Sequence, residues 1–590
     1  MAAALLAPAA AAHAQTIYPI DRAEILAGAR FDLKVEFPAD AGDVHLTING
    51  QDPQALTGSQ PEVVRNEEGG RLSALWLRNA SLRRPGTYQV TAETTTGSQT
   101  VTWNVYATGP RRARNVILFI GDGLSIAHRT AARILSKGIR QGRYNGKLAI
   151  DDMPYMALVT TAGMDSVITD SANSMSAYTT GHKSCVGAIG VYCAANLDPL
   201  AHPRVENISS LVKRLSHLAV GIVTTSELSD ATPAAMVAHT RKRTEMQSIV
   251  RMLFEAGPDV ALGGGAAQFL PRNAGGVRED DVNYIDEFKK QGYAFAADAK
   301  QLRTAAADPS VSRLLGIFNP KDIDGALDRK YLHKGSTDSL PDQPDLVEQT
   351  KAALNVLSRA ENGFLLMVES ARIDKYSHAL DWERAVYDTI MLDNAVQVAK
   401  DFARDRPDTL IVVVPDHAHP ISIVGTFDDA KSGTSPRAKL SVYGEAGYPD
   451  YPAPDAEGYP PTPDVSRRLA VLFGAYPDHC FAGKPSLDGE FHPGLPKADG
   501  GELPPDGNCQ PGTVRLFGNL PFDQPQGVHA GDDVVLTAIG PGSEAFHGQI
   551  DNTFVFRAIA EALGLGSRAA CPDPGDACAS VAIGTPLTPN

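Results

Sequence analysis

An apolar run that ends in an acid and two histidines constrains this chain more than any other feature of its sequence. Residues 410–414 are β-branched or apolar and predict a strand that is buried on both faces of a sheet. The run leads through Pro415 into Asp416, His417 and His419. Burying such groups is costly unless a cation offsets their desolvation. The pattern therefore predicts a cation-binding site at the end of this strand.

Other apolar runs also lead into acids. These runs are 115–120 before Asp122, 167–168 before Asp170 and Ser171, 221–226 before Asp230, and 364–368 before Glu369. In an open α/β sheet, ligands bind at the carboxyl ends of the strands. Several acids, several histidines and an Asp-Ser pair at such ends predict a hydrolytic site that holds more than one metal ion.

The N-terminal residues and the net charge indicate where the protein is located and which partners it can bind. Residues 1–14 read as the apolar and cleavage regions of a secretory signal, although a basic start is missing and a disordered Ala-rich tail is the alternative. We expect a periplasmic or secreted protein without a membrane span, because no other stretch approaches about 18 apolar residues. A net charge of −15 argues against a nucleic-acid-binding surface.

The six cysteines form near pairs in the sequence, namely Cys185 with Cys193, Cys480 with Cys509, and Cys571 with Cys578. An even count with such spacing is typical of disulfides in an oxidising compartment, and this pairing is the simplest of the possible connectivities. A thiolate zinc site is disfavoured because no CxxC motif occurs.

The chain divides into several segments. Residues 15–109 alternate apolar and polar side chains with period two and predict an immunoglobulin-like β-sandwich, with a spacer or docking role. Residues 115–565 alternate strands with helices, for example over 346–357 and 382–402, and predict an α/β fold with a doubly wound, mostly parallel sheet. Residues 426–525 predict an inserted loop-rich cap stapled by Cys480–Cys509, or alternatively a disordered spacer. Residues 566–590 are a C-terminal tail.

Six motifs in the α/β part carry a family resemblance. They are Gly121-Asp122-Gly123, Thr169-Asp170-Ser171-Ala172, residues 230–235 (DATPAA), residues 368–378 (VESARIDKYSH), Asp416-His417-Ala418-His419, and residues 528–533 (VHAGDD). In this order and spacing they resemble alkaline phosphatases of the bacterial, zinc- and magnesium-dependent serine type. The resemblance covers roughly residues 115–565, with the 426–525 insert unmatched by any motif.

The resemblance implies a site with two zinc ions and one magnesium ion. The implied ligands are Asp374, His378 and His529 for the first zinc, Asp122, Asp416 and His417 for the second, and Asp122, Thr232 and Glu369 for magnesium. Zinc takes histidine nitrogen and carboxylate oxygen, whereas magnesium prefers oxygen, so the residue types suit both ions. Asp170, Asp230, Lys375 and His419 would support these groups from the next layer.

Ser171 is the implied nucleophile and Arg243 the implied phosphate clamp. Ser171 opens a predicted short helix, 171–180, whose N-terminus favours an anion, and the alternative is that Ser171 only caps this helix. Arg243 follows Asp230 by the thirteen residues that the family shows. A guanidinium binds two phosphate oxygens at once. Arg241 is close enough in sequence to be confused with Arg243, and a solvated basic turn is the alternative.

The implied reaction is hydrolysis of phosphate monoesters to an alcohol and inorganic phosphate through a phosphoserine. A phosphodiesterase of the same superfamily is a rival, and Thr232, Glu369 and Arg243 argue against it. A sulfatase is disfavoured because no Cys/Ser-x-Pro-x-Arg segment occurs, and a non-enzymatic binder is disfavoured because every ligand position is filled. A homodimer is compatible with the resemblance. Asn173, Met175 and Ser176 depart from the family's small residues, so the packing behind the helix must differ.

Overall fold

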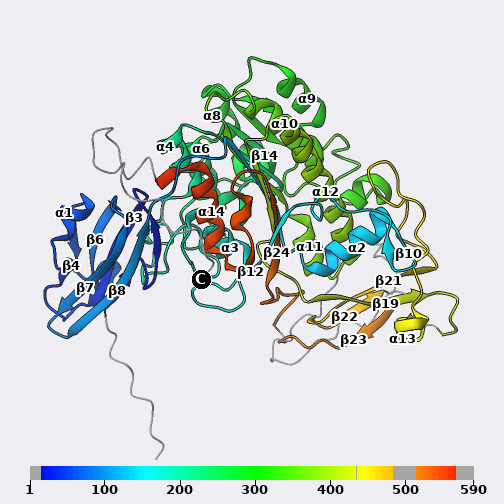
Figure 1. Ribbon diagram of the computed structural model, residues 1–590, viewed down its shortest axis with the longest axis horizontal. Helices are drawn as coiled ribbons and strands as arrows, with labels where there is room; N and C mark the ends of the chain where they lie inside the picture. Colours follow the sequence, from blue (N-terminus) through cyan, green and yellow to red (C-terminus); the bar gives the residue numbers. More distant parts are fainter. Residues whose placement is uncertain (1–14, 434, 483–512, 522, 567–590) are drawn as a thin grey trace, which may run out of the picture.

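The computed structural model describes residues 15–433, 435–482, 513–521 and 523–566. Within these ranges the chain forms an N-terminal β module, a large α/β part and a β-containing insert (Figure 1). The predicted disulfide between Cys185 and Cys193 is present. The predicted signal segment, nearly all of the predicted tail, and Cys509, Cys571 and Cys578 lie outside the described residues.

The N-terminal module consists of two four-stranded sheets. The first contains, in order, β1 (Thr16–Tyr18), β3 (Arg30–Pro38), β6 (Leu72–Ser81) and β5 (Pro61–Val64), and the second contains β2 (Glu24–Leu26), β8 (Gly97–Tyr106), β7 (Gly86–Thr94) and β4 (His45–Ile48). All neighbouring strands are antiparallel except β2 and β8. Inward-facing residues of both sheets form one hydrophobic core, in which Phe31 meets Trp103 edge to face. The immunoglobulin-like classification of this module stays a prediction.

A mixed, mostly parallel ten-stranded sheet forms the centre of the α/β part. Its strands are, in order, β15 (Ala294–Ala296), β16 (Leu314–Ile317), β14 (Val260–Gly264), β13 (Ala219–Glu227), β17 (Phe364–Ser370), β9 (Asn115–Gly121), β18 (Thr409–Val414), β24 (Val534–Ile539), β12 (Tyr155–Thr160) and β25 (Gly548–Asp551). The run from β15 to β18 is parallel, and β24 is antiparallel to both of its neighbours.

Helices cover both faces of this sheet, so the predicted doubly wound α/β architecture is confirmed (Figure 1). One face carries α3 (Ser171–Thr180), α4 (Ile208–Ser216), α6 (Met246–Ala256), α8 (Tyr284–Lys290) and α14 (Thr553–Leu563). The other carries α2 (Ile126–Lys137), α9 (Ala299–Ala307), α10 (Leu346–Leu357) and α12 (Trp382–Arg404). Shorter elements are α1 (Pro53–Thr57), α5 (Ala231–Ala234), α7 (Ala266–Phe269), α11 (Arg372–His378), β10 (Ile139–Arg140) and β11 (Arg143–Tyr144).

Strand β9 shows why the sequence reads as unbroken apolar runs. Val116, Leu118 and Ile120 face one hydrophobic core, whereas Ile117 and Phe119 face the other. Side chains alternate between the two faces of a strand, and both faces are covered by helices, so every position must be apolar. The helices predicted over 346–357 and 382–402 are present as α10 and α12.

The described part of the insert contains regular structure. It holds a sheet of β19 (Ile421–Asp428), β20 (Leu440–Ser441) and β21 (Arg467–Phe473), the hairpin of β22 (His479–Ala482) and β23 (Thr513–Leu516), and α13 (Pro436–Lys439). Tyr459 stacks on Tyr387 of α12, whose hydroxyl donates to the Pro460 carbonyl at 2.7 Å. The insert is therefore packed against α12, and its predicted role as a cap over the site stays a prediction.

No helix in the described part of the chain has both the length and the apolar character that crossing a lipid bilayer requires.

Candidate metal centre and active site

The predicted site residues meet at the carboxyl end of the central parallel strands. Strands β13, β17, β9 and β18 are neighbours in this order, and Ile120 of β9 lies level with Glu369 on one side and Val414 on the other. Asp122 and Asp416 follow β9 and β18 within two residues. The in-register parallel pairing therefore brings three acids from distant parts of the sequence to one edge of the sheet, as the strand-end pattern predicted.

The first ligand cluster contains Asp374, His378, His419 and His529. Asp374 Oδ1 lies 2.6 Å from His419 Nε2 and 3.4 Å from the Nε2 atoms of both His378 and His529. The Nδ1 atoms of His378 and His529 are turned to the backbone carbonyls of Gly527 and Thr169, at 2.5 and 2.8 Å. Donation from Nδ1 leaves Nε2 free to bind a metal ion, so the two rings are oriented as zinc ligands usually are.

The second cluster contains Asp122, Asp374 and His417. His417 Nε2 lies 3.3 Å from Asp122 Oδ1 and 3.4 Å from Asp416 Oδ2. Asp416 Oδ1 accepts a hydrogen bond from the Gly123 backbone N–H at 3.0 Å. Among the described residues, Asp122 Oδ1 and Asp416 Oδ2 are buried without a hydrogen-bond partner. Unpaired buried carboxylate oxygens that face a histidine nitrogen fit a bound cation.

The third group of predicted ligands is oxygen-only. Glu369 is buried at the end of β17, level with Ile120 of the strand that leads to Asp122, and its Oε2 accepts from Thr224 Oγ1 at 2.5 Å. Thr232 lies in α5, which packs against β13 and β17, and its hydroxyl is buried without a partner among the described residues. A hard cation such as magnesium suits these oxygen donors.

Burial and mutual repulsion raise the pKa of three of these acids, whereas the neighbouring histidines, His378 first, hold the pKa of Asp374 well below its usual value. Burial, followed by the charges of Asp416, Asp374 and Glu369, raises the pKa of Asp122 well above its usual value. Burial raises the pKa of Glu369 to about 7 and that of Asp416 to about 6. So many buried carboxylates cannot all ionise at neutral pH unless positive charge lies among them. The donor set therefore fits several divalent cations.

Ser171 occupies the first turn of α3 and is buried. Asp170 is the N-cap of this helix, with its side chain accepting from the Asn173 backbone N–H, so the alternative that Ser171 only caps the helix is wrong. Ser171 Oγ lies 3.3 Å from His417 Nε2. The helix N-terminus presents backbone N–H groups that favour an anion at this position.

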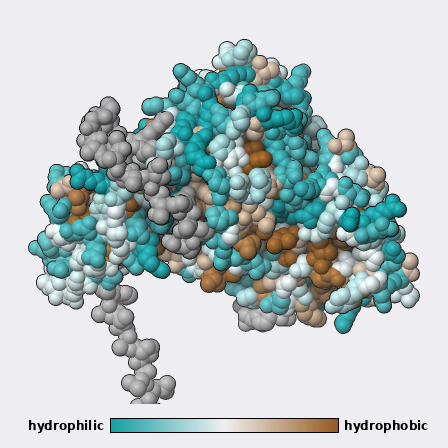
Figure 2. Space-filling view, in the orientation of Figure 1, coloured by the Kyte–Doolittle hydropathy of each residue, from teal (hydrophilic) through white to brown (hydrophobic). Residues whose placement is uncertain are grey.

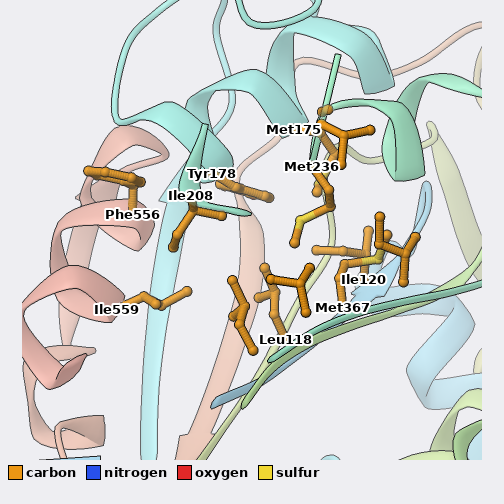
Figure 3. Close-up of a cluster of buried hydrophobic side chains, with 14 of the residues drawn as sticks. Leu118, Ile120, Met175, Tyr178, Ile208, Met236, Met367, Phe556 and Ile559 are labelled. Atoms are coloured by element: carbon orange, nitrogen blue, oxygen red, sulfur yellow. The ribbon is translucent and has the colours of Figure 1, made fainter. Parts of the chain in front are cut away.

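The departure at Met175 is explained by the core behind α3. Met175 is fully buried and belongs to the same hydrophobic cluster as Met236, Met367 and Ile120. Figure 3 shows Met175 and Met236 side by side above the strand residues. Flexible methionine side chains fill the space between helix and sheet where smaller residues on α3 would leave a gap.

Arg243, and not Arg241, faces the nucleophile helix. Its Nη1 lies 3.2 Å from Asp170 Oδ2 and its Nη2 lies 2.8 Å from Asp230 Oδ1. Arg241 instead donates to the Val186 carbonyl at an exposed position. Two carboxylates therefore hold the Arg243 guanidinium in one orientation, which pre-organises it for an oxyanion.

Lys375 is also held by two carboxylates. One belongs to the predicted site residue Asp230, and the other belongs to Asp322, which the sequence analysis missed. Lys375 Nζ lies 2.9 Å from Asp230 Oδ2 and 2.8 Å from Asp322 Oδ1, and Asp322 also pairs with Arg372 at 3.3 Å. Asp322 follows the apolar strand β16, so the pattern of apolar runs that lead into acids contained the signal for it.

Ser125 is a second residue that the sequence analysis missed. Its hydroxyl donates to the His419 carbonyl and accepts from the His419 backbone N–H, both at 2.8 Å. These bonds fix the loop that carries Asp416, His417 and His419. No pattern in the sequence pointed to this role.

Comparison with known proteins agrees with this geometry. The sequence model of the alkaline phosphatase family matches residues 113–441. The chain is 31% identical to the tissue-nonspecific alkaline phosphatase isozyme of Gallus gallus, over 78% of this chain and 86% of that protein. It is 33% identical to the alkaline phosphatase of Escherichia coli K12, over 53% of this chain and 71% of that protein.

Solved structures show the same fold. Thermus thermophilus alkaline phosphatase superposes with a TM-score of 0.54 at 23% identity, covering 78% of this chain and 93% of that chain. The alkaline phosphatase of the Antarctic bacterium TAB5 gives a TM-score of 0.52 at 20% identity, covering 77% and 99%. The chain therefore belongs to the alkaline phosphatase family, a family of metal-dependent enzymes that hydrolyse phosphate monoesters.

Proposed function

We propose that this enzyme hydrolyses phosphate monoesters through a phosphoserine at Ser171, in a site that holds two zinc ions and one magnesium ion. The observation that carries the proposal is the position of the serine. Ser171 Oγ lies 3.3 Å from His417 Nε2, in one of the two ligand clusters, and the preceding Asp170 binds Arg243. The nucleophile Ser171 is thus in contact with a cation ligand, and its neighbour Asp170 is in contact with the group that would bind an oxyanion.

Three sets of side chains would hold the ions. They are Asp374, His378 and His529 for the first zinc, Asp122, Asp416 and His417 for the second, and Asp122, Thr232 and Glu369 for magnesium. When bound, the ions would supply positive charge that favours ionisation of the serine hydroxyl and offsets the charge of the phosphate. His419 supports this arrangement through its 2.6 Å contact with Asp374.

The protein groups divide the remaining work. Arg243 binds two phosphate oxygens with its guanidinium, which Asp170 and Asp230 orient. Ser171 Oγ forms a bond to phosphorus while the bond between phosphorus and the alcohol oxygen breaks, and the alcohol leaves with the proton that the serine hydroxyl gives up. Water then attacks the phosphoserine, which frees inorganic phosphate and restores the serine hydroxyl. The N-terminus of α3 stabilises the negative charge near Oγ during both steps.

Trapping the intermediate tests this scheme. Wild-type enzyme quenched with acid during turnover of a ³²P-labelled monoester is expected to carry label on Ser171. The Ser171→Ala variant is expected to carry none, whereas Ser358→Ala, which changes a serine at the exposed C-cap of α10, is expected to label normally. Label on any residue other than Ser171 contradicts the proposal.

Monoester preference is tested separately. We expect kcat/KM for a nitrophenyl phosphate monoester to exceed that for its methyl diester, because Arg243, Thr232 and Glu369 suit a dianionic phosphate. A higher kcat/KM for the diester would assign the enzyme to phosphodiester hydrolysis instead. We also propose that the protein is exported to the periplasm or secreted, and the disulfide between Cys185 and Cys193 supports an oxidising compartment.

A further inference from the structure

One stretch of chain makes contacts with both the N-terminal β module and the surroundings of the active site. We call residues 185–206 the bridging segment. It follows the nucleophile helix α3, contains the disulfide between Cys185 and Cys193, and precedes α4. Figure 1 shows the module against the side of the α/β part where α3, α4 and α14 lie. One end of the bridging segment contacts the module, and the other end contacts Arg243 and Asp170.

The module binds the far end of the bridging segment through its backbone. Phe31 of β3 pairs with Val205 as an antiparallel bridge. The Asp32 N–H donates to the Arg204 carbonyl at 2.8 Å, and the Glu206 N–H donates to the Arg30 carbonyl at 2.9 Å. The segment is therefore attached to β3 as a short additional strand, which limits its freedom to move.

Charged side chains of the module hold the middle of the segment. Lys34 is fully buried and pairs with Glu36 and Glu67, each at 2.7 Å. Lys34 Nζ donates to Asn196 Oδ1 at 2.6 Å, and Glu36 Oε1 accepts from the Ala195 backbone N–H at 2.7 Å. Such a buried charged group tolerates little displacement of its partners, because each lost contact leaves a desolvated charge.

Glu68 adds a second point of attachment. Its carboxylate accepts from the backbone N–H groups of Leu197 and Asp198 and from the Asn196 side chain. Within the part of the chain that the structure describes, all three hydrogen bonds of the Glu68 side chain run to the bridging segment. A change at Glu68 therefore loosens the segment and leaves the two hydrophobic faces of the module intact.

The near end of the segment holds the phosphate clamp. The Gly187 carbonyl accepts from the Arg243 backbone N–H at 2.8 Å, and the Gly187 N–H donates to Asp170 Oδ1 at 3.0 Å. Ile189 and Thr240 exchange two backbone hydrogen bonds, at 2.7 and 2.9 Å. Gly187 is thus hydrogen-bonded both to the clamp arginine and to the carboxylate that orients its guanidinium.

We infer that the N-terminal β module positions the phosphate clamp through the bridging segment, with Glu36 and Glu68 as positioning residues for Arg243. The inference rests on the proposed function, in which Arg243 binds phosphate. The module would then be more than a spacer, because its contacts would influence the affinity of the enzyme for substrate phosphate. Neither glutamate contacts the ligand clusters, so their effect is on binding and not on the chemistry at Ser171.

Steady-state kinetics of the full-length, metal-loaded enzyme test this inference. Glu68→Ala and the isosteric Glu36→Gln are expected to raise both KM for nitrophenyl phosphate and Ki for inorganic phosphate by about threefold to tenfold, with kcat changed by less than about twofold. The matched control is Glu93→Ala, which changes an exposed glutamate of β7 within the same module. It is expected to change none of these constants.

A double-mutant comparison tells an effect of Glu68 that acts through Arg243 apart from a general loss of stability. In an Arg243→Ala background, Glu68→Ala is expected to raise Ki no further, because the group that it positions is gone. The inference is overturned if Ki is unchanged in both single variants, if kcat falls in parallel with Ki, or if Glu68→Ala still raises Ki without Arg243. If Arg243→Ala itself leaves Ki unchanged, the assignment of the clamp fails, which is a failure of the proposed function.

Discussion

At the scale of single residues, two cationic side chains of the candidate site are each held by two carboxylates. Arg243 lies between Asp170 and Asp230, and Lys375 lies between Asp230 and Asp322. Asp230 joins the two, so the cations share one partner. Fixing both groups before the phosphate arrives lowers the entropic cost of binding it.

The first residue-scale prediction concerns Arg243. Arg243→Ala is expected to raise KM for nitrophenyl phosphate and Ki for inorganic phosphate by about tenfold to a hundredfold, since it removes charge-assisted hydrogen bonds. Arg241→Ala loses one exposed hydrogen bond to the Val186 carbonyl of the bridging segment and removes no phosphate ligand, so it is expected to change either constant far less than Arg243→Ala does. The opposite result would move the clamp to Arg241.

A second residue-scale prediction concerns Asp322. Asp322→Asn is expected to lower kcat/KM roughly tenfold, because Lys375 loses one of its two charged partners and its orientation relaxes. Asp280→Asn serves as a control, since Asp280 pairs with Arg278 at a half-exposed position and belongs to neither ligand cluster. Equal kcat/KM in wild type and Asp322→Asn would show that Asp230 alone holds Lys375.

At the scale of elements, charged residues at helix N-termini both cap the helix and bind other charged groups. Asp170 caps α3 and binds both Arg243 and Gly187. Charge is also concentrated at the start of α12, where Arg384 in the first turn pairs with the N-cap Asp381 and with Asp328 from an earlier segment of the chain. Glu383 lies in the same turn and is also buried.

Burial, with a contribution from Asp381, raises the pKa of Glu383 to about 8. The folded state therefore keeps a proton that the unfolded chain releases above its ordinary pKa of 4.5, and stability falls as pH rises from about 5 to about 8. Glu383→Gln is expected to remove part of this loss, so its Tm exceeds that of wild type at pH 8 and equals it near pH 4.5. Thermal melts across this range measure the effect, with the exposed Glu361→Gln as control. A Tm difference that is independent of pH would contradict the assignment.

At the scale of the whole molecule, the proposed cations would hold together distant parts of the chain. Asp122, Asp374, Asp416 and His529 come from four separate segments, and their carboxylates and rings crowd together at one sheet edge. Ions bound there stabilise the folded state by mass action and relieve the repulsion between the carboxylates.

Metal removal tests this dependence. Dialysis against a chelator is expected to abolish phosphatase activity and to lower Tm, and readdition of zinc with magnesium is expected to restore both. Elemental analysis of the purified enzyme checks the proposed stoichiometry of two zinc ions and one magnesium ion. If the chelated protein melts at the same temperature as the untreated one, the ions do not support the fold.

The surface adds a further whole-molecule feature. Figure 2 shows hydrophobic side chains gathered on one face in the region where the central sheet meets the insert. Exposed apolar residues of the described chain include Met156 and Leu158 on β12, whose alternate residues Ala157 and Val159 are buried. This strand is therefore half-buried, in contrast to the unbroken burial of β9 and β18.

The sequence by itself determined the fold class and most of the strand ends, and its resemblance to a known family indicated most of the candidate site. The prediction was wrong for the run 167–168, because Val167 and Ile168 are exposed and lie outside the strands. Runs such as 410–414 can be buried only between two layers of helices, and parallel strands place their carboxyl ends at one edge, so the acids and histidines after them had to meet. The sequence does not decide which residue caps α3, because Asp170 and Ser171 both suit an N-cap. In the structure Asp170 has the extended backbone conformation of an N-cap and is the capping residue.

Only the tertiary structure decided which charged residues serve the site from a distance. Glu36 and Ala195 are 159 positions apart, and Asp322 and Lys375 are 53 apart. Period and propensity describe neighbours along the chain, whereas these contacts depend on how sheets and connecting segments pack in space. The role of the β module follows from such contacts, because a strand-like sequence specifies its own sheet but not the surface on which that sheet docks.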